Sequence, residues 1–332
     1  MSSNLNNEHF LSEFTIKNFK SIKHCHVGGC KRINLFIGRP NAGRSNILEA
    51  LSLFSIPFLR ENKSKNLSNL VRIENETELF NGGNLQEPIS ITTNTGSATV
   101  HLDRDKGLYV MTNTHLGGGD FIIDEKLNVK SRYASQHIPV IKKYSFSSHT
   151  QFRKGHTRYL TVPYGDNLLG VIERHEALTE EISQMFKEYN LKLVFDKASQ
   201  SLKIMQSEKN GIFLIPYHSI SGALQRIIFF KTAIAGNHNS VLLFEEPEAH
   251  LFPPFITQIT QEMIYKKDNQ CFIATHSPFI LNDLLENARE ELSVYMVDYK
   301  KHETKVKLLS DQQLHDIYQN GVDLFTNSET FI

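Results

Sequence analysis

Two groups of polar residues in this sequence have the spacing of a nucleotide site. In the first, FIGRPNAGRSNILEAL at residues 36–51, four residues separate Gly38 from Gly43. Such a loop turns its backbone N–H groups toward an anion, and the N-terminus of the following helix adds its dipole. Gly43 is expected to let the backbone approach phosphate closely. The predicted phosphate-binding residues are Gly38, Arg39, Pro40, Asn41, Ala42, Gly43, Arg44, Ser45 and Asn46, and the Ser45 hydroxyl is also a predicted Mg²⁺ ligand.

One position departs from the usual phosphate loop, because Arg44 stands where lysine is normal. Lysine is a compact point charge, whereas arginine is a wide planar fork. Since the positive charge is kept, we expect nucleotide affinity to survive. The contact with the β- and γ-oxygens is displaced, and losing one charge-assisted contact costs ~1.5–3 kcal/mol. If that loss falls in the transition state, hydrolysis slows roughly ten- to a hundredfold.

The second group, SVLLFEEPEAHLFPP at residues 240–254, places two carboxylates after a short apolar strand. Side chains at the carboxyl end of a buried parallel strand lie where such sheets bind ligands. We predict that Glu245 holds Mg²⁺ and that Glu246 orients and deprotonates the attacking water. The alternative is a charged loop ended by proline, which leaves the glycine loop unexplained.

A third motif, QCFIATHSPF at residues 270–279, is another apolar strand with a polar end. A lone histidine at such a position is more often structural. Here the strand follows the acidic strand by one predicted helix, as a neighbouring strand of the same sheet would. We therefore predict that His276 contacts the γ-phosphate or its water.

The elements that must position these residues follow from the spacing of apolar side chains. A strand, RINLFIG, leads into the glycine loop, and the loop leads into a helix. Residues from about 56 to 165 alternate in short runs, which predicts an antiparallel lobe. Residues 166–190 form a predicted amphipathic helix, residues 191–206 a hairpin, and from Ser219 helices and apolar strands alternate as in a parallel sheet. We predict one α/β domain, 1–332, with segments 1–60, 61–165, 166–218 and 219–332.

Composition narrows the class of protein. Basic and acidic residues balance at 36 each, which argues against a surface coated for non-specific DNA binding. Three cysteines are too few for a disulfide framework. The group HCHVGGC at residues 24–30 lacks a second cluster at metal-ligand spacing, so zinc is not expected. The sequence starts without a secretion signal, and no apolar run approaches the ~20 residues that span a bilayer. We expect a cytoplasmic protein with no membrane partner.

In this order, the motifs resemble those of the ABC-type ATPase heads of the SMC, RecF and OLD group, and more narrowly the stand-alone AAA-15 and AAA-21 ATPases. The matching stretches are FTIKNFKSI, GRPNAGRSNILEAL (Walker A), SGALQR (signature), LLFEEPEAHL (Walker B) and ATHSPF (the switch-histidine loop). The resemblance implies a P-loop NTPase with a mixed central sheet, helices on both faces and an inserted antiparallel β lobe. It also implies ATP and Mg²⁺ as cofactors. Glu245 stands where aspartate is more usual in such heads.

The resemblance further implies an ATP-dependent dimer, or a higher oligomer, in which two heads face each other. Ser221 and Gly222 of one head would then contact the γ-phosphate held by the other. A helix N-terminus presents free N–H groups to an anion. The simpler alternative is that Ser221 only caps a helix, and both roles are compatible. Such heads usually carry a glutamine beside the metal at the edge of the lobe, and Gln86 is the candidate here.

The partner of this ATPase stays open between two classes. In the first, the chain regulates a separately encoded effector protein, as in bacterial anti-phage or mobile-element defence. In the second, it is a DNA-binding ATPase of repair or recombination type. The second class is suggested by residues 142–160, which interleave aromatic side chains with Lys142, Lys143, Arg153, Lys154 and Arg158. A third reading is that ATP is bound only as structural support.

Overall fold

The centre of the molecule is a six-stranded mixed sheet. The computed structural model describes residues 8–103, 106–115, 117–134, 139–148, 152–187, 189–209, 211–320, 324–325 and 331. The strand order is β16-β15-β3-β14-β13-β9, in which all neighbours from β15 to β9 are parallel and β16 is antiparallel to β15. The bounds are β3 Ile33–Gly38, β9 Ile141–Tyr144, β13 Val241–Glu245, β14 Gln270–Ala274, β15 Leu292–Lys300 and β16 Glu303–Leu308. The expected mixed sheet is confirmed.

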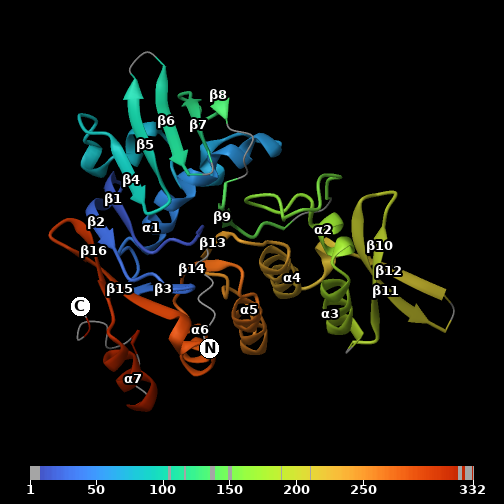
Figure 1. Cartoon of the computed structure of the whole chain (residues 1–332). Coiled ribbons are helices and arrows are strands. Elements are labelled where there is room, and N and C mark those ends of the chain that lie inside the picture. The colour runs from blue at the N-terminus through green and yellow to red at the C-terminus, as the bar shows by residue number, and fades with distance from the viewer. Residues whose placement is uncertain are drawn as a thin grey trace.

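The middle strands of this sheet are apolar because both of its faces are covered. Strands β3 and β14 are buried along their whole length, and β13 is buried up to its last residue. Figure 1 shows α1 above the sheet, α5 and α6 below it, and α4 to the right of β13 beside α5, with α7 next to α6. The bounds are α1 Arg44–Leu51, α4 Gly222–Ala235, α5 Pro253–Tyr265, α6 Pro278–Asn287 and α7 Asp311–Asn320. The prediction of helices on both faces is therefore confirmed.

A second, antiparallel sheet of seven strands stands over α1, in the order β2-β1-β4-β5-β6-β7-β8 (Figure 1). Its strands are β1 Phe14–Phe19, β2 Ile22–Val27, β4 Ile89–Thr93, β5 Gly96–Asp103, β6 Gly107–Thr114, β7 Gly117–Ile123 and β8 Val129–Ala134. Short 3₁₀ helices, η1 Ser52–Glu61, η2 Leu67–Asn69, η3 Glu76–Leu79 and η4 Asn81–Gly83, connect α1 to β4. The antiparallel lobe is confirmed, with one correction. Residues 141–144, expected in the lobe, form β9 of the central sheet and pair with β13.

The segment between β9 and α4 forms a third unit at the side of the molecule (Figure 1). The single helix predicted over residues 166–190 is two helices, α2 Leu168–Arg174 and α3 Glu176–Lys187, because His175 between them is extended at φ −103° and ψ 93°. The predicted hairpin is present as β10 Leu191–Asp196 and β11 Ser201–Glu208. A third strand, β12 Gly211–Pro216, pairs with β11. Its sequence, GIFLIP, lacks the alternation that would have predicted a strand.

Candidate nucleotide site

The three sequence motifs meet because their strands are neighbours. In the pairing register, Phe36 of β3 lies opposite Ala274 of β14, and Ala274 lies opposite Glu245 of β13. The carboxyl ends of parallel strands share one edge of a sheet, so the loops that follow these strands converge. They border a cleft of ≈ 580 Å³. The cleft is lined by Pro40, Asn41, Ala42, Gly43, Arg44, Ser45, Asn46, Arg72, Ser145, Phe146, Arg226, Glu245, Glu246 and His276.

The glycine loop is supported from behind by polar side chains. Gly43 has φ +101°, and a Cβ there would lie 2.1 Å from Oγ1 of the buried Thr304. Thr304 Oγ1 lies 2.7 Å from Ser21 Oγ, and Asn46 Nδ2 donates to the same Ser21 oxygen at 2.7 Å. The first turn of α1 has no side-chain cap, which leaves its N–H groups available to an anion. Gly43 is therefore required by backbone conformation and packing, in addition to the phosphate approach that the sequence suggested.

The side chain of Arg44 is buried and reaches across to the switch-histidine loop at residues 275–277. Its Nη1 donates to the backbone oxygen of Thr275 at 2.7 Å, and its Nη2 donates to Nε2 of His276. Burial lowers the pKa of Arg44, and the nearby carboxylates of Glu246, Glu248 and Glu245 oppose that shift. The guanidinium stays charged. The link between the phosphate loop and the histidine loop was not predicted from sequence.

Glu245, the predicted magnesium ligand, faces two cations from other segments. Arg72 donates from Nη2 to Glu245 Oε1 at 2.7 Å, and Lys143 Nζ lies 3.9 Å from Glu245 Oε2. Lys143 is only 4% exposed, and its ammonium also donates to the backbone oxygen of Leu70 at 2.7 Å. Burial lowers the pKa of Lys143, against the attraction of Glu49 and Glu245. The carboxylate is thus oriented by side chains that lie outside the three sequence motifs.

Glu246, the predicted base, has a constrained backbone and a partly open carboxylate. Its φ of 44° is unusual for a residue with a side chain, and such strain is concentrated at functional sites. Its N–H donates to Ala274 O at 2.8 Å, and Arg226 Nη2 donates to its carbonyl oxygen at 2.7 Å. Glu246 Oε1 lies 3.4 Å from His276 Nε2. The backbone of Glu246 is therefore held by the backbone of β14 and by the Arg226 side chain of α4, and this fixes the position of its carboxylate.

Glu248, the third glutamate of the acidic motif, fastens the histidine loop. Its Oε1 accepts a hydrogen bond from Thr275 Oγ1 at 2.6 Å and another from the backbone N–H of His276 at 3.0 Å. Burial raises the pKa of Glu248. The sequence EEPE could have predicted this contact, because a third carboxylate just after the acidic pair lies close to the loop that follows the neighbouring strand.

Other predicted residues lie elsewhere. Gly38 and Arg39 precede the part of the loop that lines the cleft. Ser221 and Gly222 are exposed at the start of α4 and lie outside the cleft, and Ser221 Oγ accepts from Ala223 N at 3.2 Å as a helix cap. Gln86, the expected third metal ligand, is exposed in the turn before β4, where its N–H donates to Asn84 Oδ1 at 3.2 Å. Gln86 is absent from the described residues that line the cleft with Ser45 and Glu245.

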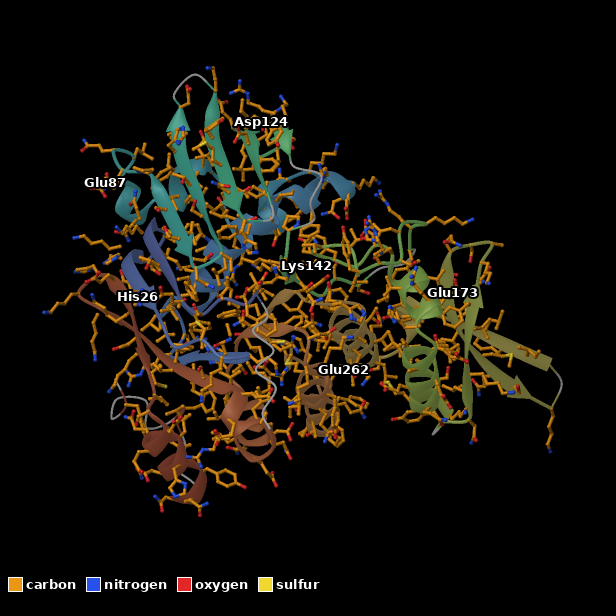
Figure 2. The ribbon with its side chains drawn as sticks, viewed as in Figure 1. His26, Glu87, Asp124, Lys142, Glu173 and Glu262 are labelled. Carbon is orange, nitrogen blue, oxygen red and sulfur yellow. The ribbon has the colours of Figure 1, made fainter. Side chains whose placement is uncertain are left out.

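Two of the five basic residues that suggested DNA binding at residues 142–160 are buried. Lys142, like Lys143, is 4% exposed, and its Nζ donates to Asn237 Oδ1 at 2.6 Å and to Ser240 Oγ at 3.0 Å. Figure 2 places Lys142 in the middle of the molecule. Both lysines lie in β9, the last strand of the central sheet, and their buried side chains cannot reach a DNA backbone. Arg153, Lys154 and Arg158 are exposed, and residues 149–151 lie outside the described residues.

The residues of the cleft fit a nucleotide with Mg²⁺. The loop and the N-terminus of α1 supply backbone donors for phosphate. The Ser45 hydroxyl and the Glu245 carboxylate are hard oxygen ligands of the kind that Mg²⁺ takes, with water and phosphate completing its shell. Fold and cleft together are similar to those of a P-loop ATPase head of the ABC type.

Comparison with known proteins agrees with this class. Residues 123–282 match the AAA_21 family, described as "AAA domain, putative AbiEii toxin, Type IV TA system". Among solved structures, an SMC head bound to the C-winged helix domain of ScpA matches with a TM-score of 0.53 and 16% identity, over 91% of this chain and 98% of that one. An SMC head with an extended coiled coil, bound to the C-terminal domain of ScpA and derived from Pyrococcus furiosus, matches with a TM-score of 0.50 and 12% identity, over 94% and 99%. A comparison with curated proteins found no match.

The chain therefore has the fold of the ABC-type ATPase heads of the SMC and RecF group, as the motifs predicted. Within the part of the chain that the structure describes, no helix combines the length and apolar character needed to cross a membrane.

Proposed function

We propose that this protein is a slow, Mg²⁺-dependent cytoplasmic ATPase that assembles head to head when ATP is bound, as a dimer or a higher oligomer, and so regulates a separately encoded effector protein. The observation that carries the proposal is the convergence of the phosphate loop, Glu245, Glu246 and His276 on one cleft. Phosphate cradle, metal ligand, base and histidine are the parts that phosphoryl transfer to water requires.

Each side chain has a distinct task in hydrolysis. The loop N–H groups hold the β- and γ-phosphates, while Ser45 and Glu245 would hold Mg²⁺, which neutralises charge on the phosphate oxygens when bound. Glu246 accepts a proton from the attacking water. Arg226 keeps the Glu246 carboxylate in place by donating a hydrogen bond to the backbone oxygen of Glu246. His276 contacts the γ-phosphate or its water.

The exposed start of α4 supports the contact between two heads. Ser221 and Gly222 are exposed, and a Cβ added at Gly222 would meet no atom of the described residues within 4 Å. A second molecule can therefore approach this helix N-terminus closely. The same helix carries Arg226, which bonds to the backbone of the catalytic loop. Docking a partner's phosphate at Ser221 would thus act directly on the position of Glu246.

Regulation of an effector in anti-phage or mobile-element defence is the reading we favour for the assembly. The description of the matching family names a putative toxin of a type IV TA system. The alternative, a DNA-binding ATPase, is weakened because Lys142 and Lys143 are buried and only Arg153, Lys154 and Arg158 remain exposed on that stretch. DNA binding that weakens steeply with salt would favour this alternative.

The decisive experiment measures mass by light scattering and phosphate release, with and without ATP–Mg²⁺. The native chain should turn over slowly. Because a general base contributes about 10²–10⁴ in rate, Glu246→Gln should lose at least a hundredfold while accumulating an ATP-bound assembly. Glu290→Gln, at a carboxylate outside the cleft, is the matched control. Binding of ATP without turnover or change of mass would instead show a structural ligand and end the proposal.

A further inference from the structure

The contact between Arg44 and His276 fixes which ring nitrogen carries the proton. Arg44 donates through Nη1 to Thr275 O at 2.7 Å and through Nη2 to His276 Nε2. A guanidinium has N–H donors only and no acceptor. Nε2 must therefore be the unprotonated, accepting nitrogen, and the neutral ring carries its hydrogen on Nδ1.

A second group competes for the same nitrogen. Glu246 Oε1 lies 3.4 Å from His276 Nε2, and a carboxylate at this place can only accept a hydrogen bond. The two contacts demand opposite states of Nε2, so they exclude each other. The contact with Arg44 has the stronger support, because that side chain is 7% exposed and is anchored to Thr275 O. Glu248 holds the histidine loop from its other side through the backbone N–H of His276.

We propose that Arg44 is a positioning residue for His276, which holds Nε2 as an acceptor and thereby keeps the ring neutral and Glu246 free of a histidine donor. The roles of His276 and Glu246 in this sentence rest on the proposed ATPase function, whereas the tautomer does not. Without a histidine donor, the Glu246 oxygen stays open to a water molecule, and His276 offers Nδ1–H as its donor.

This role gives a reason for arginine where the phosphate loop normally has lysine. The planar fork serves Thr275 O and His276 Nε2 at once from two nitrogens held in one plane. The single ammonium of a lysine would have to divide itself between these acceptors and the phosphate. The arginine thus displaces the contact with the β- and γ-oxygens but fixes the tautomer of His276, which a lysine would not do.

The charged groups that face the ring act in opposite directions on the pKa of His276. They are Arg44, Glu246 and, through the backbone, Glu248. Burial lowers the pKa of His276, and Arg44 lowers it further, whereas Glu246 raises it. Removing the guanidinium should therefore raise the pKa of His276.

The test reads the tautomer directly. Protein labelled with ¹⁵N-histidine is examined by long-range ¹H–¹⁵N spectra between pH 6 and 9, without nucleotide, and His276→Gln assigns the signal. We expect the Nδ1–H tautomer in the native chain. In Arg44→Met the signal should change to Nε2–H, with a higher midpoint of titration than in the native chain. Arg44→Lys should fail to restore the native pattern.

Arg289→Lys is a matched control, because Arg289 Nη1 contacts Nδ1 of His315 at 3.2 Å and should affect that ring alone. An Nε2–H tautomer of His276 in the native chain would overturn the proposal, and so would an unchanged tautomer and midpoint in Arg44→Met. The native measurement decides even if the variants do not fold. A native Nδ1–H tautomer in a chain that hydrolyses no ATP would uphold the assignment and refute the ATPase instead.

Discussion

Replacing the buried Glu49 by glutamine should destabilise the protein strongly. Glu49 lies in α1, is 0% exposed, and accepts from Lys20 Nζ at 2.5 Å, from Arg72 Nε at 3.0 Å and from Arg72 N at 3.2 Å. Lys143 is also close enough to affect its pKa. Three cations therefore depend on two carboxylates, Glu49 and Glu245. After Glu49→Gln, the same three cations would share one.

The size of the loss follows from the burial of the cations. The side chains of Lys20 and Lys143 are only 13% and 5% exposed, so water cannot replace the lost carboxylate. Breaking a buried ion pair by removing one partner costs ~3–5 kcal/mol. Glutamine keeps one acceptor oxygen, which places Glu49→Gln near ~3 kcal/mol. In a chain of 332 residues that loss lowers Tm by roughly 4 °C.

The assay is urea and thermal unfolding followed by circular dichroism, with the exposed Glu290→Gln as a control expected within about 0.5 kcal/mol of the native chain. Burial alone would raise the pKa of Glu49, but Lys143, Lys20 and Arg72 together lower it. Its contribution is therefore present above the unfolded value, about pH 4.3, and is lost as the pH falls through the folded pKa. Native and variant chains should converge in acid. A loss below about 1 kcal/mol at pH 7 would refute this account of the charge network.

Three further outcomes are expected. Arg226→Met removes the bonds to the backbone of Glu246 and should lower kcat by about tenfold with little change in KM, measured by steady-state phosphate release. Arg72→Gln removes a cation that competes with Mg²⁺ for Glu245. Because an exposed ion pair is worth up to ~1 kcal/mol, the half-saturating Mg²⁺ concentration, measured by a magnesium titration of ATP turnover, should fall by up to about fivefold. Burial lowers the pKa of Lys142 to about 7, so the unfolded chain binds more protons than the folded chain between pH 7 and 10, and the free energy of unfolding rises with pH. In Lys142→Met the rise between pH 7 and 9, measured by urea unfolding, should be smaller by about 2 kcal/mol. An unchanged kcat, an unchanged magnesium midpoint or parallel pH profiles would contradict these three in turn.

The part of the site that could be predicted from sequence lies in contiguous motifs. The loop around Gly43, the acidic pair and His276 each follow a buried strand directly, so naming the strand also located the side chain. The order of the strands in the sheet then brought the motifs together. The antiparallel lobe could also be predicted from sequence, because apolar and polar residues alternate along its short strands.

The partners of these residues could not be predicted, because tertiary contacts decide them. Arg72 comes from a loop with no periodicity, yet it joins Glu49 to Glu245. Lys142 and Lys143 were interpreted as an exposed basic face, since lysine is rarely buried. Pairing of β9 with β13 buries both of them, one on each face of the sheet, and each finds hydrogen-bond acceptors there. The environment of the strand overrode the local signal.

The three glutamates of the acidic motif show how environment assigns roles to identical side chains. Glu245 is paired with Arg72 and Lys143, and Glu248 is bonded to Thr275 and the backbone of His276. Glu246 is held through its backbone, whereas its carboxylate is 46% exposed to the cleft.

A carboxylate oriented by cations suits a metal ligand, one that fastens a loop suits support, and the one left open suits a proton acceptor. Glu246→Gln should therefore stop turnover while leaving stability near native. Glu248→Gln should reduce stability first, because it disturbs the buried contacts of the histidine loop. Unfolding midpoints measured beside turnover separate the two, and equal losses of stability would show that this division of roles is wrong.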